Sequence, residues 1–237
     1  MGNAKKKDAG ATGPVDMRAK PVKTLRKLDG TFYDRPGVVA VARDLLGKVL
    51  VTEFGGRRTS GRIVETEAYN GVGDRASHAW SGRRTRRTEV MYAAGGTAYV
   101  YLIYGIHHLF NVVTNKKDIP HAVLVRALEP MEGIEVMRER LGKGRVDGGA
   151  NEVLKPDYSL TRGPGNLSRA LGLQTVHTGV SLMGDEIWIG DDGYRPKKSE
   201  ITAGQRIGVD YAGVDAGLPY RFFIKGSPYV SGPKTKG

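Results

Sequence analysis

The sequence predicts one α+β domain over residues 29–237, and two observations support this prediction. Most apolar runs are short, rich in β-branched or aromatic residues and bounded by glycine or proline, whereas only three stretches have helical spacing. No repeat and no linker interrupts this region, so its helices and strands are expected to share one core. The length of 237 residues and the hydrophobic content of 39% supply enough apolar side chains for such a core.

The first predicted helix begins near Pro36 and ends before Gly47, which places proline and glycine where helices favour them. Two strands follow at 48–54 and 61–69, and the pair Gly55-Gly56 predicts a hairpin between them. The later elements are expected, in chain order, as strands at 97–104, 109–114 and 122–128, a helix at 131–141, a mobile loop rich in glycine and charge at 143–156, a helix at 164–171, and strands at 186–189, 206–209 and 221–224.

The chain carries a formal net charge of +12 and no cysteine. The lack of cysteine excludes a disulfide framework, a thiolate metal site and a cysteine nucleophile, and the basic balance favours nucleic acid or an acidic membrane surface as partner. Residues 1–28 hold eight basic and two acidic residues, so we expect a disordered basic tail that either only aids solubility or binds phosphate non-specifically. This tail has no apolar stretch typical of a signal peptide, which predicts a cytoplasmic or, in a eukaryote, nuclear protein that is not secreted.

A second basic cluster lies in the middle of the chain, at Arg83, Arg84, Arg86 and Arg87. Four neighbouring arginines repel one another unless an anion lies across them, which favours a loop that contacts phosphate over a merely solvated loop. The segment 90–115 that follows has no Asp, Glu, Lys or Arg. Glycine, histidine and asparagine interrupt it and its tyrosines alternate with period two, so we expect a buried or cleft-lining pair of strands and no association with a membrane.

The strand at 61–69 carries the first candidate for chemistry. Alternation along it places Ile63 on one face with the carboxylates Glu65 and Glu67 and the phenol of Tyr69. Such a face is poor core material and predicts the floor of a solvated cleft; the alternative is the exposed polar face of an edge strand.

Tyrosines mark the next candidate, at 99–106. Tyr99 and Tyr101 share a face of their strand, and Gly105 permits a tight turn that leaves Tyr104 and Ile106 at the tip of a β-hairpin. Tyrosines in strands are usually core residues. An aromatic residue at a protruding tip can instead wedge between stacked bases, while aromatic walls can hold a base that has left the stack.

An arginine inside the apolar strand at 122–128 is the third candidate. A buried guanidinium without a partner is very costly, so Arg126 is expected to meet a carboxylate or an anionic ligand, and Glu67 is one candidate partner. A purely structural salt bridge is the alternative. The five histidines have no recognised metal-ligand spacing, so no metal site is expected.

Seven sequence blocks that include these candidates occur in a familiar order: RIVETEAY at 62–69, ASHA at 76–79, YVYLIYG at 99–105, NVV at 111–113, RALEP at 126–130, GPG at 163–165 and GSP at 226–228. Together they resemble the alkyladenine (3-methyladenine, methylpurine) DNA glycosylase family. The similarity runs from about residue 45 to residue 231. It implies a curved antiparallel β-sheet core flanked by helices, with a protruding hairpin that inserts into DNA.

The resemblance also implies roles for individual residues. Glu67 matches the family's general base, which activates water. Arg126 and the main-chain carbonyl of Ile207 match groups that help to hold that water. The matches at Tyr69, His78 and Tyr101 form the pocket for the flipped base.

The remaining matches concern selectivity and grip on DNA. Asn111 matches a residue that crowds the exocyclic amine of normal guanine, and Tyr104 matches the residue inserted through the minor groove, with Ile106 beside it. Two positions depart from the family pattern: Arg86 replaces a common proline, and Asn166 replaces a common lysine, which removes an expected phosphate contact. We expect the backbone contacts to come from Arg83, Arg84, Arg86, Arg87 and Arg169.

The expected activity is that of a monofunctional DNA glycosylase in base excision repair, without cofactor, acting as a monomer on double-stranded DNA that contains damaged purines. It would flip an alkylated or deaminated purine out of the duplex and hydrolyse the N-glycosidic bond. No lysine lies within the matched pocket blocks, so lyase chemistry through a Schiff base is not expected. A non-catalytic damaged-DNA-binding protein and an RNA-binding module are the alternatives.

Overall fold

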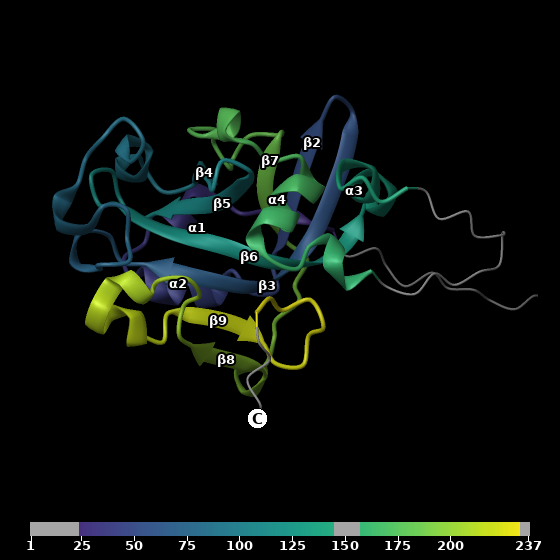
Figure 1. The fold of residues 1–237 in the computed structure, drawn as a ribbon. Coiled ribbons are helices and arrows are strands. Elements are labelled where there is room, and N and C mark those ends of the chain that lie inside the picture. Colours follow the sequence, from purple (N-terminus) through teal and green to yellow (C-terminus); the bar gives the residue numbers. More distant parts are fainter. Residues whose placement is uncertain (1–23, 145–156, 233–237) are drawn as a thin grey trace, which may run out of the picture.

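The computed structural model describes residues 24–144 and 157–232, and these form one α+β domain built on an antiparallel sheet (Figure 1). The α-helices are α1 (Gly30–Tyr33), α2 (Val38–Asp44), α3 (Ile134–Arg140) and α4 (Pro164–Leu171). The strands are β1 (Arg26–Lys27), β2 (Val49–Phe54), β3 (Arg57–Tyr69), β4 (Thr97–Ile103), β5 (His107–Thr114), β6 (His121–Glu132), β7 (Ile187–Asp191), β8 (Ile201–Gly204) and β9 (Arg221–Ile224). Short 3₁₀ helices lie at Gly71–Gly73, Trp80–Gly82, Glu89–Tyr92, Tyr158–Leu160, Thr175–His177, Lys198–Glu200 and Asp210–Gly217.

The strands follow the order β1-β7-β2-β3-β6-β5-β4 in the sheet. In addition, β9 pairs with β3, and β8 pairs with β9. All of the pairings are antiparallel, as expected from the resemblance. Apolar side chains from α2, such as Val41, and from α4, such as Leu167, belong to the same buried cluster as Phe110 of β5 and Phe222 of β9. The sheet therefore curls around one main core, and the expected curved sheet flanked by helices is confirmed.

Three register shifts interrupt the pairing between β3 and β6, and two of them flank Glu65. Ile63 pairs with Leu128 and Glu65 with Ala127, so Val64 is an extra residue in β3. The next pair is Thr66 with Val125, which makes Arg126 an extra residue in β6. A bulge turns side chains to a different face. Ile63 consequently packs in the main core with Ala68, so its predicted place on the face of Glu65 and Glu67 is wrong.

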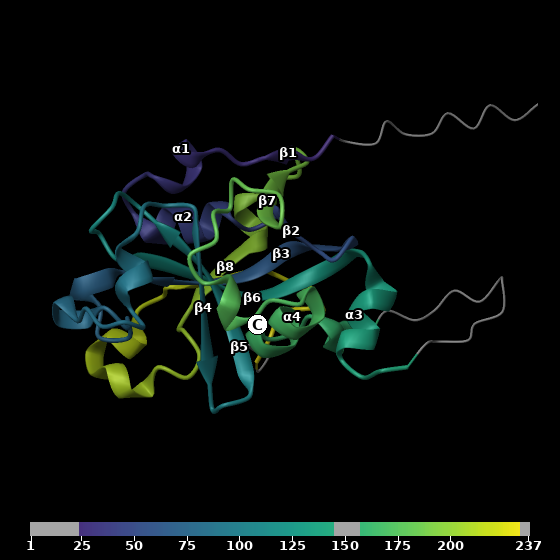
Figure 2. The ribbon, with the colours of Figure 1, turned by 90° about the horizontal axis from the view of Figure 1, so that it is seen from above.

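The β4–β5 hairpin projects from the sheet on the side opposite α1 (Figure 2). Its turn spans residues 104–106, where Tyr104 has φ +52° and Gly105 has φ +71°. Because this turn points away from the sheet, the side chains at its tip are solvent-exposed: Tyr104 is 85% exposed and Ile106 is 71% exposed. The expected hairpin with these two residues at its tip is thus present.

Several expectations about the elements need correction. The predicted strand at 206–209 is irregular, since Gly208 has φ +74° and Arg206 turns inward; the short strand β8 before it was not predicted. Ordered structure also begins before residue 29, because β1 pairs with β7 and Leu28 is buried. The remainder of the expected tail, 1–23, and most of the expected mobile loop, 145–156, lie outside the described residues. Within the described residues no helix is long and apolar enough to cross a membrane.

Candidate active site

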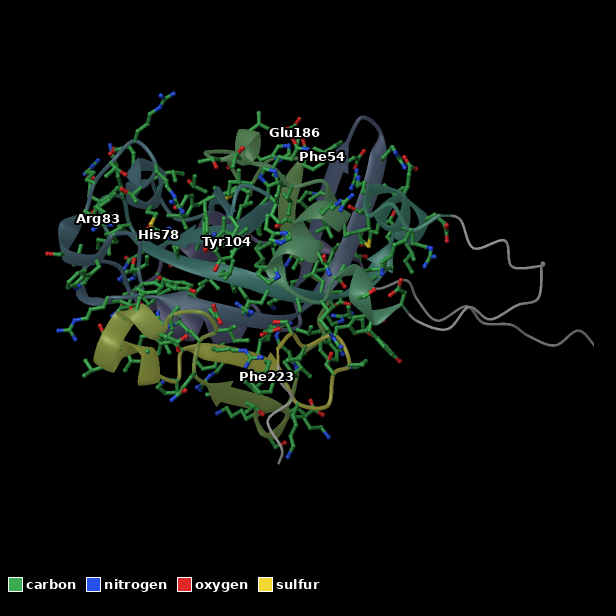
Figure 3. The ribbon with its side chains drawn as sticks, viewed as in Figure 1. Phe54, His78, Arg83, Tyr104, Glu186 and Phe223 are labelled. Atoms are coloured by element: carbon green, nitrogen blue, oxygen red, sulfur yellow. The ribbon has the colours of Figure 1, made fainter. Side chains whose placement is uncertain are left out.

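A cavity of about 280 Å³ opens beside the β4–β5 hairpin and collects most of the predicted site residues. Tyr69, the last residue of β3, lines one side of the cavity, and β4, β5 and β6 supply further lining side chains. The loops at 70–92 and 205–211 close the remaining sides; in Figure 3, His78 and Arg83 lie in the first of these loops, at the end of the sheet away from α3. The polar and aromatic lining residues are Tyr69, His78, Arg87, Tyr99, Tyr101, Tyr104, Asn111, Arg126 and Tyr211, and Ile207 is one of the apolar lining residues.

Glu67 lies directly behind the wall of this cavity. Its side chain is fully buried, and its Oε1 accepts a hydrogen bond of 2.7 Å from the main-chain N–H of Ile207 and lies 3.2 Å from Nη1 of Arg126. Oε2 accepts a hydrogen bond of 2.9 Å from the Tyr69 hydroxyl. The three donors all line the cavity, so the carboxylate is coupled to the cavity through each of them.

A second carboxylate holds Arg126 in place. Oε1 of Glu65 accepts from Nε of Arg126 at 3.0 Å and from Nε of Arg221 at 2.7 Å, and its Oε2 accepts from the main-chain N–H of Ser231 at 2.6 Å. Two buried carboxylates thus balance two buried guanidinium groups. Glu65 and Glu67 are both fully buried, so the predicted exposure of these two carboxylates to a solvated cleft is wrong, whereas Tyr69 of the same predicted face does line the cavity. The alternative of an edge strand is also wrong, because β3 pairs on both sides.

Aromatic side chains form one side of the cavity. The rings of Tyr99 and Tyr101 lie 5.4 Å apart, and the His78 ring meets Tyr101 edge-on at 4.7 Å. Nδ1 of His78 lies 2.9 Å from the Tyr99 hydroxyl. Burial, followed by the neighbouring charge of Glu67, raises the pKa of Tyr69 well above its usual value, so this phenol stays protonated and donates to Glu67.

Asn111 is buried in the wall and cannot rotate freely. Its Nδ2 donates to the main-chain carbonyls of Tyr99 at 3.1 Å and Leu109 at 3.2 Å, which fixes the orientation of the amide. A rigid polar group at a cavity wall can reject ligands by shape as well as by missing hydrogen bonds.

The predicted backbone-binding arginines are all exposed, but their environments differ. Arg84 pairs with Glu89 at 2.7 Å and with Asp118 at 3.1 Å, so its charge is already matched. The guanidinium of Arg87 lies 5.1 Å from the centre of the Tyr101 ring and lines the cavity. Arg169 lies on α4, in a separate cleft on the other flank of the hairpin that also contains Asn166 and Ile106. The structure therefore divides these arginines between two sides of the hairpin.

Sequence reasoning missed several residues of the site. Arg206 and Asp74 form a fully buried ion pair beside Tyr69, and Tyr211 stands at the cavity mouth with 70% of its surface exposed. Arg206 and Tyr211 lie in the segment that was expected to be a strand or a turn. The sequence around Arg206 offers a weaker signal than that around Arg126, because Gln205 precedes it and Gly204 and Gly208 lie nearby.

Comparisons with known proteins identify the family of this chain. A family model described as methylpurine-DNA glycosylase (MPG) matches residues 31–228. The chain belongs to the methylpurine-DNA glycosylase family. A relative from Clostridium acetobutylicum is 46% identical over 205 residues, which cover 86% of this chain and 97% of the relative. Relatives from Alkaliphilus oremlandii (44% over 206 residues; 86% and 98% covered) and Desulfitobacterium hafniense (42% over 208 residues; 87% and 99% covered) carry the same name, "Putative 3-methyladenine DNA glycosylase".

Membership confirms the expected resemblance and makes the protein a DNA glycosylase for alkylated bases, a hydrolase of N-glycosyl bonds that serves DNA repair. In this methylpurine-DNA glycosylase, the described residues contain no group of three or more His, Asp or Glu side chains that could hold a metal ion.

One prediction concerns His78 of this methylpurine-DNA glycosylase. Burial, and then the charges of Arg87 and Arg83, lower the pKa of His78 from 6.5 to about 4. Between these values the unfolded chain binds a proton that the folded chain resists, so the contribution of His78 to stability is lost as the pH falls from about 6.5 to about 4. The free energy of unfolding, measured by urea denaturation at about pH 7 and about pH 5, is expected to fall less in His78→Gln than in the parent. Equal falls in the two proteins would contradict the assignment.

Proposed function

We propose that this protein flips an alkylated or deaminated purine out of double-stranded DNA and hydrolyses its N-glycosidic bond, leaving an abasic site. The observation that carries the proposal is the buried carboxylate of Glu67, held by donors from Tyr69, Arg126 and Ile207 immediately behind an aromatic cavity. The cavity volume of about 280 Å³ is just below the range of about 300–1,000 Å³ typical of drug-sized ligands, so it suits a single nucleobase.

Damage at the base favours the first step. Extrusion of one nucleotide costs a few kcal/mol, and least at a damaged or mismatched pair. A purine alkylated at N3 or N7 is a cation, which interacts favourably with the faces of tyrosine rings and leaves without further protonation. We propose that Tyr69 and Tyr101 stack on the extruded base, that His78 meets its edge, and that Asn111 excludes normal guanine. His78 is neutral at pH 7 because burial lowers its pKa to about 4, so it adds no repulsion against a cationic base.

Bond cleavage would then rest on Glu67. As the bond to C1′ breaks, the sugar develops oxocarbenium character, which an adjacent carboxylate stabilises. Glu67 would accept the proton of the attacking water, while Arg126 and the carbonyl of Ile207 hold that water. No lysine of the described ranges 24–144 and 157–232 lines the cavity, which supports hydrolysis alone rather than a lyase step through a Schiff base.

The hairpin tip would fill the space that the nucleotide leaves. Tyr104 is 85% exposed and also borders the cavity, so a ring inserted into the duplex at this point stands beside the extruded base. Replacement Tyr104→Ala is expected to weaken binding to a duplex with an abasic-site analogue by about 1–3 kcal/mol of lost stacking, roughly a 5- to 150-fold rise in Kd. The Kd of parent and variant for this duplex is measured by fluorescence anisotropy.

The matched control is Met131→Ala, because Met131 is 46% exposed at the end of β6 and does not border the cavity. We expect its Kd to equal that of the parent. A Tyr104→Ala protein that binds as tightly as the parent would rule out the wedge.

A single release assay tests the function itself. The protein is mixed with duplex DNA that contains 7-methylguanine, with undamaged duplex and with RNA, and free base is measured by chromatography. Release from the alkylated duplex alone is expected. Binding to damaged DNA without release would favour the non-catalytic alternative, and a preference for RNA would favour an RNA-binding module.

A further inference from the structure

A buried ion pair lies behind the cavity and has no part in the chemistry proposed above. The side chains of Arg206 and Asp74 are 0% and 1% exposed. Two parallel contacts join them, with Nη1 2.5 Å from Oδ2 and Nη2 2.9 Å from Oδ1. Bidentate pairs of this kind fix direction as well as distance.

The pair connects three segments that each supply a wall of the cavity. Nη1 of Arg206 donates to the carbonyl of Ala68, the residue between Glu67 and Tyr69, at 2.9 Å. Nη2 donates to the carbonyl of Asp215, in the segment that contains Tyr211, at 3.1 Å. The carboxylate of Asp74 accepts from the main-chain N–H groups of Asn70 at 2.9 Å and Ala76 at 3.0 Å.

The guanidinium of Arg206 also packs against the ring of Tyr69, and the residue after Arg206 contacts Glu67. The central carbon of this guanidinium lies 4.9 Å from the centre of the Tyr69 ring. The next residue, Ile207, donates its main-chain N–H to Glu67. The Arg206 side chain thus contacts the Tyr69 ring and directly precedes the residue whose amide donates to Glu67.

Stability does not require such a pair, because well-packed apolar residues replace buried ion pairs without loss in many proteins. Both loops involved, 70–79 and 205–209, lack strand pairing, so their backbone positions depend on contacts such as these. We infer that Asp74 and Arg206 are positioning residues, which hold the Tyr69 ring and the Ile207 amide in the geometry that base release needs. This inference rests on the proposed function.

The test compares Arg206→Lys and Asp74→Asn with the parent. Lysine keeps the charge but loses the planar fork; asparagine keeps the size but loses the charge. We expect the rate constant of base release at saturating enzyme to fall about 10- to 100-fold, as misplacement of reacting groups by about 1 Å does. The Kd for duplex with an abasic-site analogue should change less than about threefold, because the hairpin tip is untouched.

The matched control is Asp191→Asn. Asp191 also forms a buried ion pair, with Lys48 at 2.8 Å, but on β7 and away from the cavity. This variant should lose stability while its release rate per folded molecule stays at the parent value. The inference is overturned if Arg206→Lys and Asp74→Asn behave in the same way as this control.

A second measurement does not depend on activity. Hydrogen exchange at the Ile207 amide of the free protein should accelerate at least about tenfold in Asp74→Asn, while amides in the β2–β3 hairpin keep their parent rates. Unchanged exchange at Ile207 would overturn the positioning role even if the parent released no base. A parent that releases no base, with faster exchange in the variant, would instead refute the proposed function and leave the positioning role supported.

Discussion

Glu67→Gln is expected to lower the rate constant of base release at saturating enzyme by about 10²- to 10⁴-fold, the usual contribution of a general base. Glutamine keeps the size of the side chain but cannot accept the proton of water or stabilise an oxocarbenium-like sugar. The effect should be large because the donors from Tyr69, Arg126 and Ile207 all converge on this one carboxylate. Single-turnover release of 7-methylguanine from a short duplex measures the rate constant.

Two measurements make this prediction specific. The Kd for a duplex with an abasic-site analogue should remain near the parent value, since the exposed hairpin tip is unchanged. The exposed Glu139, which pairs with Arg57 on the surface, provides a matched substitution, and Glu139→Gln should release base at the parent rate. Base release by Glu67→Gln near the parent rate would show that another group activates the water.

Much of the fold follows from local sequence patterns. Helix α4 has the predicted bounds 164–171, and β2 and β3 form the expected hairpin around Gly55 and Gly56. The hairpin tip at Tyr104 was also predicted, because a glycine that follows an alternating run of tyrosines is a local signal. Such features depend on residues close together in the chain, so they can be predicted from the local sequence pattern.

The parts that failed depend on distant partners. Alternation along β3 placed Glu65 beside Glu67 correctly but could not show that bulges at Val64 and Arg126 turn Ile63 into the core. The segment at 206–209 was expected to be one of several strands separated by glycine and proline turns at the end of the chain. Its true conformation is set by Asp74, which lies more than a hundred positions away and draws Arg206 inward.

The pairing of charges in the site shows the same dependence. The expectation that Arg126 meets Glu67 is confirmed, with 3.2 Å between Nη1 and Oε1. The second carboxylate, Glu65, could not be assigned from the sequence because its other partners, Arg221 and Ser231, come from the end of the chain. The carboxylate of Glu67, which we propose as the general base, therefore depends on a buried framework that only the assembled fold reveals.

This framework leads to the second large effect, which concerns stability. Glu65→Gln is expected to lower the free energy of unfolding by about 3–5 kcal/mol, the usual cost of removing one partner from a buried ion pair. Glu65 contacts both Arg126 and Arg221 from a fully buried position, so loss of its charge leaves Arg126 with Glu67 alone and deprives Arg221 of its carboxylate partner. Urea denaturation of parent and variant measures the difference.

The control separates this network from ion pairs in general. Glu139→Gln removes a carboxylate that accepts two hydrogen bonds from Arg57, but at the surface, where water screens the charges. Its denaturation midpoint should stay close to that of the parent. If Glu65→Gln were as stable as Glu139→Gln, the charge of Glu65 would be dispensable, and the placement of Arg126 beside Glu67 would have to be explained by the bulge in β6 alone.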